Sequence, residues 1–194
     1  MKPKNTTGTY RGIYYDSHEE LAMLQWLFEL KDSDYIRDLR RAPSFLLSDA
    51  LVNSYVIPLK TKSKNGTQTL LQPHSYTAEF LVCWNYKKAR DKIIWTLGVD
   101  TNRFDKHLIA QKKDDTWCSY IECKPSYDFN NMTRTFILNR KWMWQKYGIF
   151  VNLVKKDSLF EKTFTPAEYL KTATGKQRKI KWKPRSLKHF LDHR

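Results

Sequence analysis

The chain has little glycine, few cysteines and no long hydrophobic run. Only six of its 194 residues are glycine, and it has no GxxxxGK[ST] phosphate loop, which excludes an ATP-driven P-loop motor within this sequence. The three cysteines, Cys83, Cys118 and Cys123, form no CxxC pair, so we expect reduced, structural thiols and no zinc site. No segment approaches about 18 uncharged apolar residues, and the polar start lacks the apolar core of a signal peptide. We therefore expect a cytoplasmic protein with no membrane partner.

What the sequence does have is a large excess of positive charge. Its 35 lysines and arginines against 20 acidic residues leave a net charge of +15, which favours a polyanionic partner such as nucleic acid. The basic residues are dense near the C-terminus, where Trp182 lies among them, so cations could meet phosphates while the indole stacks on a base. The candidate nucleic-acid-binding residues in this tail are Lys176, Arg178, Lys179, Lys181, Trp182, Lys183 and Arg185. The alternative is a solvated tail for which Trp182 is only an anchor.

The order of predicted elements favours an α/β or α+β fold, with a mixed central β-sheet flanked by helices. Hydrophobic residues make up 41% of the chain, enough for the core of one domain. Capping residues, β-branched runs and helical periodicity predict, in chain order, a helix at about 17–30, strands at 42–47, 51–59, 76–84, 92–99 and 116–124, a helix at 131–147 and a strand at 149–154. Asn65 and Gly66 predict a hairpin turn.

A glutamate occupies the middle of the apolar face of the first predicted helix. At about 100° per residue, Leu24 and Leu27 fall within roughly 40° of Glu20, whereas Glu19 lies at the edge of this face. A carboxylate directed into a core costs several kcal/mol unless it is paired. Glu20 therefore needs a cationic side chain or a metal ion as its partner, and the helix alone does not distinguish the two.

Two predicted strands carry further acids. Glu79 lies among apolar residues in YTAEFLV, where it either faces water or joins a site. In SYIECKP, the period of two places Glu122 and Lys124 on one face of a strand, so both side chains reach the same point. A cross-strand ion pair is the ordinary explanation of this spacing.

The three carboxylates and the lysine together predict more than each does alone. Glu20, Glu79 and Glu122 would form an oxygen-rich pocket for a hard divalent cation, Mg²⁺ or Mn²⁺, with Lys124 beside it. Mg²⁺ often shares the phosphates of a substrate, so the implied chemistry is hydrolysis of a phosphodiester bond. Lys124 would orient the attacking water or stabilise charge on the transition state.

These residues resemble motifs of the PD-(D/E)XK nuclease superfamily over about residues 14–154. YYDSHEEL is similar to the first-helix motif that supplies a metal-binding glutamate, YTAEFLV to the motif that begins the second catalytic strand, and YIECKP to the (D/E)XK motif. The resemblance implies a restriction-endonuclease-like domain at 1–160, followed by a basic C-terminal extension at 161–194. It also implies an endonuclease dependent on Mg²⁺ or Mn²⁺, with Glu20, Glu79 and Glu122 as metal ligands and Lys124 as the catalytic lysine. Within the superfamily, the chain resembles small phage endonucleases, Holliday-junction resolvases and transposon-end nucleases.

The sequence departs from the family pattern near the second carboxylate. Ala78 and Glu79 stand where the family usually has Pro-Asp, so the acid is one methylene longer. The interval to Glu122 is long and contains Asp100, which is the alternative second ligand. Arg140, on the second long helix, points either toward the carboxylates and a substrate phosphate or toward a structural partner.

The expected function is therefore a metal-dependent DNA endonuclease, acting on branched or phage DNA in the host cytoplasm if the protein is phage-encoded. A homodimer is expected if a junction must be cut on two strands. The basic tail would add affinity by counterion release, so binding should weaken steeply with salt. The main alternative is a non-catalytic DNA-binding or virion-associated protein that retains the fold. A second alternative is an RNA-directed nuclease or RNA-binding module, because nothing in the sequence separates DNA from RNA.

Overall fold

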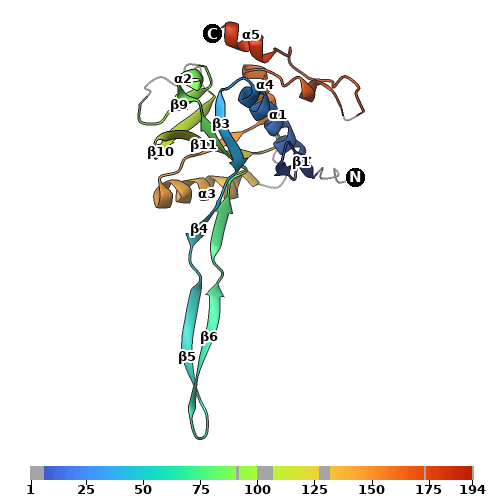
Figure 1. Ribbon diagram of the computed structural model, residues 1–194. Helices are drawn as coiled ribbons and strands as arrows, with labels where there is room; N and C mark the ends of the chain where they lie inside the picture. Colours follow the sequence, from blue (N-terminus) through green and yellow to red (C-terminus); the bar gives the residue numbers. More distant parts are fainter. Residues whose placement is uncertain (1–6, 91, 100–106, 127–131, 173, 194) are drawn as a thin grey trace.

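Runs of β-branched and aromatic residues form the six-stranded sheet on which the protein is built (Figure 1). The computed structural model describes residues 7–90, 92–99, 107–126, 132–172 and 174–193. The strands of this sheet are β3 (Ile36–Arg41), β8 (Phe80–Trp84), β9 (Ile94–Thr96), β10 (Leu108–Lys113), β11 (Thr116–Cys123) and β12 (Val151–Val154). The predicted mixed sheet with flanking helices is confirmed.

The central strand, β11, has two different neighbours along one of its edges. On its other edge, β3, β8 and β11 form an antiparallel series. The first half of β11 pairs with β10, which is antiparallel to it, and β9 extends the sheet parallel to β10. The second half, from Tyr120 to Cys123, pairs with β12 in parallel orientation. The end of β11, which carries Glu122, is therefore enclosed within the sheet.

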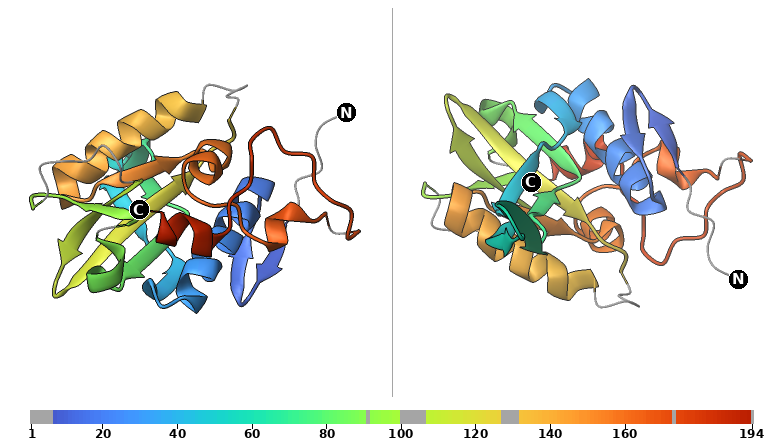
Figure 2. Two further views of the ribbon diagram at one scale, coloured as in Figure 1. Left: turned by 90° about the horizontal axis from the view of Figure 1, so that it is seen from above. Right: turned by 90° about the horizontal axis from the view of Figure 1, so that it is seen from below.

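Helices cover both faces of this sheet (Figure 2). α1 (His18–Asp32) packs against one face, where it buries Trp26 completely. α3 (Met132–Tyr147) connects β11 to β12 and packs against the other face, where it buries Met143 completely. The sheet thus separates two hydrophobic clusters, one beneath α1 and one beneath α3.

Local capping signals explain where the two long helices begin and end. Ser17 caps α1, because its hydroxyl accepts a hydrogen bond from the backbone N–H of Glu20 at 3.1 Å. Gly148 follows α3 with a φ of +63°, a conformation that favours glycine and ends the helix. Both predicted helices are confirmed to within two residues at each end.

Shorter elements complete the body, and the C-terminal extension belongs to it. These elements are β1 (Gly8–Tyr10), β2 (Ile13–Tyr15), α2 (Tyr86–Ala89), α4 (Lys156–Lys162), the 3-10 helix η1 (Glu168–Leu170) and α5 (Leu187–Asp192). In the extension, Phe164, Tyr169 and Phe190 are buried in the same cluster as α1. The boundary at residue 160 therefore divides the chain by charge and not by packing. None of the described helices is long and apolar enough to cross a membrane.

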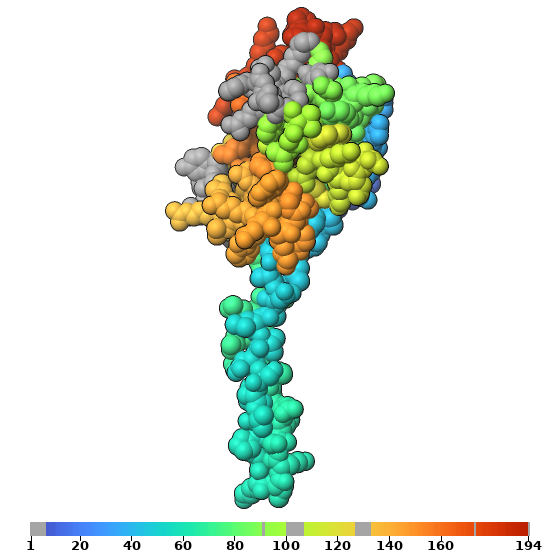
Figure 3. Space-filling view, turned by 90° about the vertical axis from the view of Figure 1, so that its left-hand side faces the viewer, coloured from blue at the N-terminus to red at the C-terminus, as the bar shows by residue number. Residues whose placement is uncertain are grey.

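Between β3 and β8, the chain leaves the body as a long two-stranded ribbon at residues 44–77, here termed the arm (Figure 3). Its proximal part pairs β4 (Ser44–Ser48) with β7 (His74–Thr77). Its distal part pairs β5 (Leu51–Pro58) with β6 (Ser63–Leu71). Both pairs are antiparallel, so the arm is one extended hairpin with its turn far from the body.

The predicted turn at Asn65 and Gly66 is wrong. Both residues lie inside β6, and the chain reverses at residues 59–62, where the backbone N–H of Leu59 donates to the carbonyl of Lys62 at 2.8 Å. Gly66 lies opposite Tyr55, and a Cβ at this glycine would come within 2.8 Å of the Tyr55 ring. The glycine therefore makes room for a cross-strand aromatic ring and does not form the turn.

Candidate active site

The candidate site lies where the arm leaves the body (Figure 1). Glu20 comes from the first turn of α1, Glu79 from the break between β7 and β8, and Glu122 and Lys124 from the end of β11 and the residues after it. Arg41 contacts both Glu20 and Glu79, and the backbone N–H of Glu79 donates to the carbonyl of Ile121, the residue before Glu122. The three predicted carboxylates and the predicted lysine therefore form one cluster.

Glu20 is buried and paired. Only 3% of the residue is exposed, and its Oε2 accepts a hydrogen bond from Arg41 Nη1 at 2.6 Å. The backbone N–H of Asp16 and the hydroxyl of Ser17 donate to the same carboxylate at 3.4 Å. The prediction that Glu20 points into the core and needs a partner is confirmed, and in this structure the partner is a cationic side chain.

Glu79 lies at the point where the chain passes from the arm into the sheet. Its backbone N–H donates to the carbonyl of Ile121 at 2.9 Å, and its carbonyl accepts from the N–H of Ala42 at 3.3 Å. These bonds fix the break between β7 and β8, which were predicted as one strand. Glu79 Oε2 accepts from Arg41 Nη2 at 2.8 Å, so a single guanidinium bridges Glu20 and Glu79.

Both oxygens of Glu122 are engaged. Lys124 Nζ lies 2.6 Å from Glu122 Oε1, and the hydroxyl of Tyr76 donates to Glu122 Oε2 at 2.8 Å. The prediction that Glu122 and Lys124 reach the same point is confirmed. Because their side chains are only 6% and 15% exposed, this pair is shielded from solvent much more than an ordinary surface ion pair.

Burial and mutual repulsion raise the pKa values of two of the carboxyls. Burial raises the pKa of Glu20 to about 8, with further contributions from Asp16 and Glu79, although Arg41 opposes the shift. Burial, followed by the charge of Glu122, raises the pKa of Glu79 above its ordinary value. Each carboxyl therefore gains from a proton or a cation at the site.

The sequence did not reveal two members of the cluster, Arg41 and Tyr76. Arg41 ends β3, a strand that was not predicted because charged residues dominate IRDLRR. The available signal was the spacing of two, which places Arg41 on the same strand face as the buried Leu39. Tyr76 lies in β7 on the arm, and its contact with Glu122 depends on the pairing of distant strands.

Two other predicted residues are not placed in the cluster. The guanidinium of Arg140 lies 5.4 Å from the ring centre of Phe136 and 5.2 Å from that of Phe150. Arg140 therefore packs between two aromatic rings, which favours the structural alternative that the sequence analysis left open for this residue. Asp100, the alternative second ligand, lies outside the described residues.

In the C-terminal extension, part of the predicted nucleic-acid surface holds the fold together. Trp182 Nε1 donates to Thr165 Oγ1 at 2.9 Å, and its half-buried ring packs against the core, which supports the interpretation of Trp182 as an anchor. Arg178 donates to the carbonyl of Tyr169, and Arg185 donates to the carbonyl of Glu161. The predicted residues that remain exposed are Lys176, Lys179, Lys181 and Lys183.

The chemistry of the cluster suits a hard divalent cation, because its donors are carboxylate oxygens. Within the described part of the chain, no three Asp, Glu, His or Cys side chains are grouped closely enough to hold a metal ion. Arg41 stands between Glu20 and Glu79, and Lys124 contacts Glu122, so cationic side chains neutralise the cluster in this structure. A metal ion would have to replace Arg41 between the two carboxylates that it bridges.

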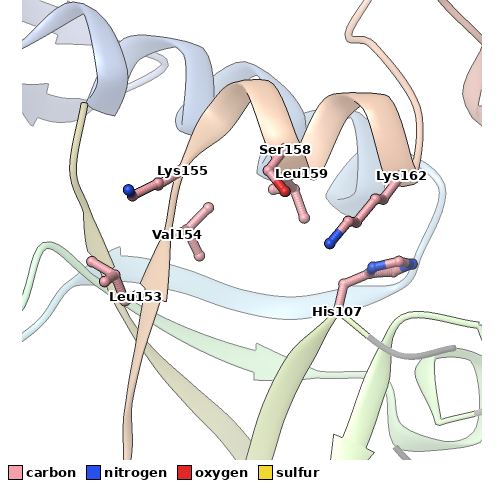
Figure 4. Close-up of a pocket in the computed structure, with 7 residues that line it drawn as sticks. All are labelled: His107, Leu153, Val154, Lys155, Ser158, Leu159 and Lys162. Carbon is pink, nitrogen blue, oxygen red and sulfur yellow. The ribbon is translucent and has the colours of Figure 1, made fainter. Parts of the chain in front are cut away.

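A separate hollow of about 310 Å³ lies between α4, the end of β12 and the start of β10 (Figure 4). Its lining includes Lys155, Lys162 and His107, and none of the four predicted catalytic residues contributes to it. Among the residues that the structure describes, no acidic side chain lines it either. It is a basic surface feature distinct from the carboxylate cluster.

No protein-family model, curated protein or solved structure matches this chain. Similarity to known proteins therefore neither supports nor opposes the resemblance to the PD-(D/E)XK superfamily. The geometry of the site and the order of its supporting elements are the basis for inferring a function.

Proposed function

We propose that this protein is a metal-dependent DNA endonuclease that hydrolyses phosphodiester bonds. The observation that carries the proposal is the meeting of Glu20, Glu79, Glu122 and Lys124, from separate elements, at the root of the arm. Placing three ionised acids close together in a buried site reduces the stability of the folded protein, in line with the raised pKa values of Glu20 and Glu79. Such arrangements concentrate at functional sites, and three carboxylates beside a lysine suit metal-assisted phosphodiester hydrolysis.

The order of elements supports a restriction-endonuclease-like core as part of this proposal. α1 is followed by the antiparallel strands β3, β8 and β11, then by α3 and the parallel strand β12. This is the order that the resemblance to the PD-(D/E)XK superfamily implies. The arm is then an insertion between the first and second strands of that core.

Each residue of the cluster has a role in the proposed chemistry. Glu20, Glu79 and Glu122 would hold the cation, and Tyr76 keeps Glu122 from rotating away by its hydrogen bond. When bound, Mg²⁺ or Mn²⁺ would supply positive charge at the scissile phosphate and lower the pKa of a coordinated water. Lys124, held 2.6 Å from Glu122, is positioned to donate a hydrogen bond to the attacking water or to a phosphate oxygen.

Arg41 acts in this proposal as the cation that occupies the cluster before a metal does. Its guanidinium donates to both Glu20 and Glu79, and its side chain is 33% exposed, so it has an open path toward solvent. It also lies at the end of β3, immediately before the arm. Once displaced, the guanidinium would be close to the substrate backbone, where it would pair with a phosphate.

One observation favours a second candidate, a DNA-binding protein that retains this fold without catalysis. Each acid of the cluster already contacts a cation, Arg41 or Lys124, within 2.8 Å. A cluster paired in this way is satisfied without a metal ion. A pure binder gains nothing from an acid in a basic surface, so Glu122→Gln should strengthen its binding to DNA.

Cleavage assays with the purified protein test the proposal directly. A supercoiled plasmid, a synthetic four-way DNA junction and an RNA duplex are incubated with Mg²⁺, Mn²⁺ or EDTA. We expect cut DNA only when a divalent metal is present. Binding without cleavage in every metal condition would favour the second candidate, and cleavage of RNA alone would move the proposal to an RNA substrate.

A further inference from the structure

The arm is an isolated ribbon that projects from the body (Figures 1 and 3). Every residue of β5 is exposed, and all but one residue of β6 are exposed. Lys60, at the turn, follows Arg41, at the cluster, by 19 residues, so at about 3.3 Å per residue the arm spans roughly 60 Å from the cluster to its far end. A two-stranded hairpin alone is marginally stable in water, so we expect the arm to lie against another molecule when the protein acts.

The distal part of the arm, β5, the turn and β6, carries positive charge and no acid. Between residues 50 and 78, the sequence contains three lysines, Lys60, Lys62 and Lys64, and no aspartate or glutamate. All three lysines are exposed and lie at the far end of the arm, around the turn. Asn53 and Gln68, which lie opposite each other on β5 and β6, carry side-chain amides. Amides are groups that hydrogen-bond to phosphates and base edges in DNA complexes. This surface is complementary to a polyanion.

Both ends of the arm adjoin the carboxylate cluster. Arg41 lies just before β4, and Glu79 lies just after β7. Tyr76, which donates to Glu122, belongs to β7 itself. A nucleic acid whose phosphate reaches the cluster therefore lies at the root of the arm, within reach of its whole length.

We propose that the distal part of the arm enters a groove of double-stranded DNA bound at the cluster and contacts it a little under two helical turns from the phosphate at the site. This inference rests on the proposed function and specifies its substrate as a B-form duplex. The span of roughly 60 Å from the cluster to the lysines is a little under two turns of B-DNA, at about 34–36 Å per turn. The three lysines then lie against phosphates that border the groove.

The shape of the arm separates DNA from RNA, which the sequence alone does not. The major groove of B-DNA, about 12 Å wide, admits a two-stranded β-ribbon. The major groove of an A-form RNA helix is deep and too narrow for side chains to read. The arm therefore cannot enter the major groove of duplex RNA as it can that of B-DNA, so we expect weaker binding of the arm to duplex RNA.

The charge of the arm also selects DNA over a second copy of this chain. The arm exposes apolar residues, among them Val52, Val56 and Leu71, and exposed apolar surface can serve protein contacts. Two arms in contact at their far ends, however, would bring two sets of three lysines together, and the distal part of each arm has no acid to pair with them. Like charges so arranged repel each other, whereas DNA neutralises them.

The test compares two variants that each lose three exposed lysines. The arm variant changes Lys60, Lys62 and Lys64 to Gln, and the control variant changes Lys87, Lys112 and Lys113, on the body, to Gln. Binding to a DNA duplex of about 30 base pairs, which exceeds two helical turns, is measured at several salt concentrations by fluorescence anisotropy. The same measurements use an RNA duplex of the same sequence, and EDTA prevents cleavage throughout.

We expect the arm variant to bind DNA more weakly and with a smaller salt dependence. Three phosphate contacts account for a change of about 2–3 in the slope of log K against log salt. The control variant and all RNA measurements should change much less. Equal losses in the two variants, or an equal loss on RNA, would overturn the proposal. The proposal would also be overturned if the arm variant kept the wild-type salt slope and sedimentation velocity showed that the wild type forms a dimer and the arm variant does not. The arm would then join two copies of the chain.

The same experiment keeps this inference distinct from the proposed function. Binding in EDTA requires no catalysis, so the arm-specific loss of salt dependence can be observed even if the protein cleaves nothing. That result would contradict the nuclease and retain the arm as a DNA-binding element. Metal-dependent cleavage by the wild type without any arm-specific effect on DNA binding would contradict the arm alone.

Discussion

The carboxylate cluster and the arm are adjacent in the fold, yet the charges of the cluster are buried and paired, whereas those of the arm are exposed and of one sign at its far end. In the cluster, the side chains of Glu20, Glu122 and Lys124 are 4–15% exposed, and each acid contacts a cation within 2.8 Å. On the distal part of the arm, from β5 to β6, three lysines are exposed in a segment that contains no acid. In the proposed function the cluster would exchange Arg41 for a metal ion, whereas the lysines of the distal arm would be neutralised by an external polyanion. The comparison separates a place suited to chemistry from a surface suited to recognition.

The largest expected effect comes from changing the cluster. In the proposed function Lys124→Met removes a hydrogen-bond donor to the attacking water or the scissile phosphate, so we expect the rate of plasmid cleavage to fall by about 10²–10³-fold. Glu122→Gln removes a ligand charge and should reduce cleavage at least as much. Both effects are measured as single-turnover cleavage rates at saturating protein, so that a change in DNA affinity does not contribute.

A matched control for these variants is Glu161→Gln, at an exposed position on α4. We expect this control to cleave DNA at the wild-type rate. If Lys124→Met and Glu122→Gln also keep that rate, the cluster is a structural ion-pair network and the site assignment is wrong.

The next effect concerns Arg41, the cation shared by Glu20 and Glu79. Arg41→Met leaves two neighbouring carboxylates without their partner, so the free energy of unfolding of the metal-free protein should fall by about 1–3 kcal/mol. Because the variant no longer competes with a metal ion, Mg²⁺ should raise its melting temperature more than that of the wild type. Thermal unfolding with EDTA and with Mg²⁺ measures both changes.

Arg11→Met provides the comparison for Arg41. Arg11 also contacts an acid, Asp32 at 2.7 Å, but both side chains of that pair are about half exposed. We expect little change in stability and the same response to Mg²⁺ as in the wild type. An equal effect of Mg²⁺ on the Arg41 and Arg11 variants would show that Arg41 and the metal do not share a site.

A smaller effect is expected from pH. Burial raises the pKa of Glu20 from its ordinary value of 4.5 to about 8, so between these values the folded protein binds a proton that the unfolded chain releases. The free energy of unfolding contributed by Glu20 is therefore fully present below pH 4.5 and is lost as the pH rises through about 8. In EDTA, the wild type should lose stability across this range relative to Glu20→Gln, measured as melting temperature against pH. A difference between the two proteins that is constant with pH, or that increases in favour of the wild type, would contradict this account.

The smallest effect on the body should come from the distal arm. Gly66→Val would place a Cβ within 2.8 Å of the Tyr55 ring and disturb the pairing of β5 with β6. The melting temperature of the body should change little, because the arm is exposed and remote from the core, while the salt dependence of DNA binding should fall as it does in the lysine variant. Thr67→Val, at an exposed neighbouring position, is the control. A large loss of stability in Gly66→Val would show that the arm and body unfold as one unit.

Local patterns in the sequence predicted the parts of the molecule that local interactions determine. The cap at Ser17 and the helical period predicted α1 and the burial of Glu20, because both depend on residues within a few turns. The period of two predicted that Glu122 and Lys124 share a strand face. The gathering of three carboxylates was expected from their combined occurrence on apolar elements and from the resemblance to a family, and not from any single local pattern.

The features that the sequence did not predict depend on contacts between distant segments. The sequence does not predict β3, because charged residues dominate this strand and obscure its alternation of apolar and polar positions. One of these charged residues, Arg41, pairs with Glu20 of α1 and with Glu79, the residue before β8. Gly66 was assigned to a turn because the space that Tyr55 requires is visible only once β5 and β6 are paired. Trp182 anchors the extension through Thr165, a partner that spacing in the sequence does not reveal.

The most direct test of the central claim is whether the carboxylate cluster binds a divalent cation. Isothermal titration calorimetry of Mn²⁺ into the metal-free protein, without DNA, compares the wild type with Glu122→Gln and Arg41→Met. The account predicts binding to the wild type, weaker binding or none to Glu122→Gln, and tighter binding to Arg41→Met. Absence of binding to the wild type, or equal affinity in all three proteins, would contradict it.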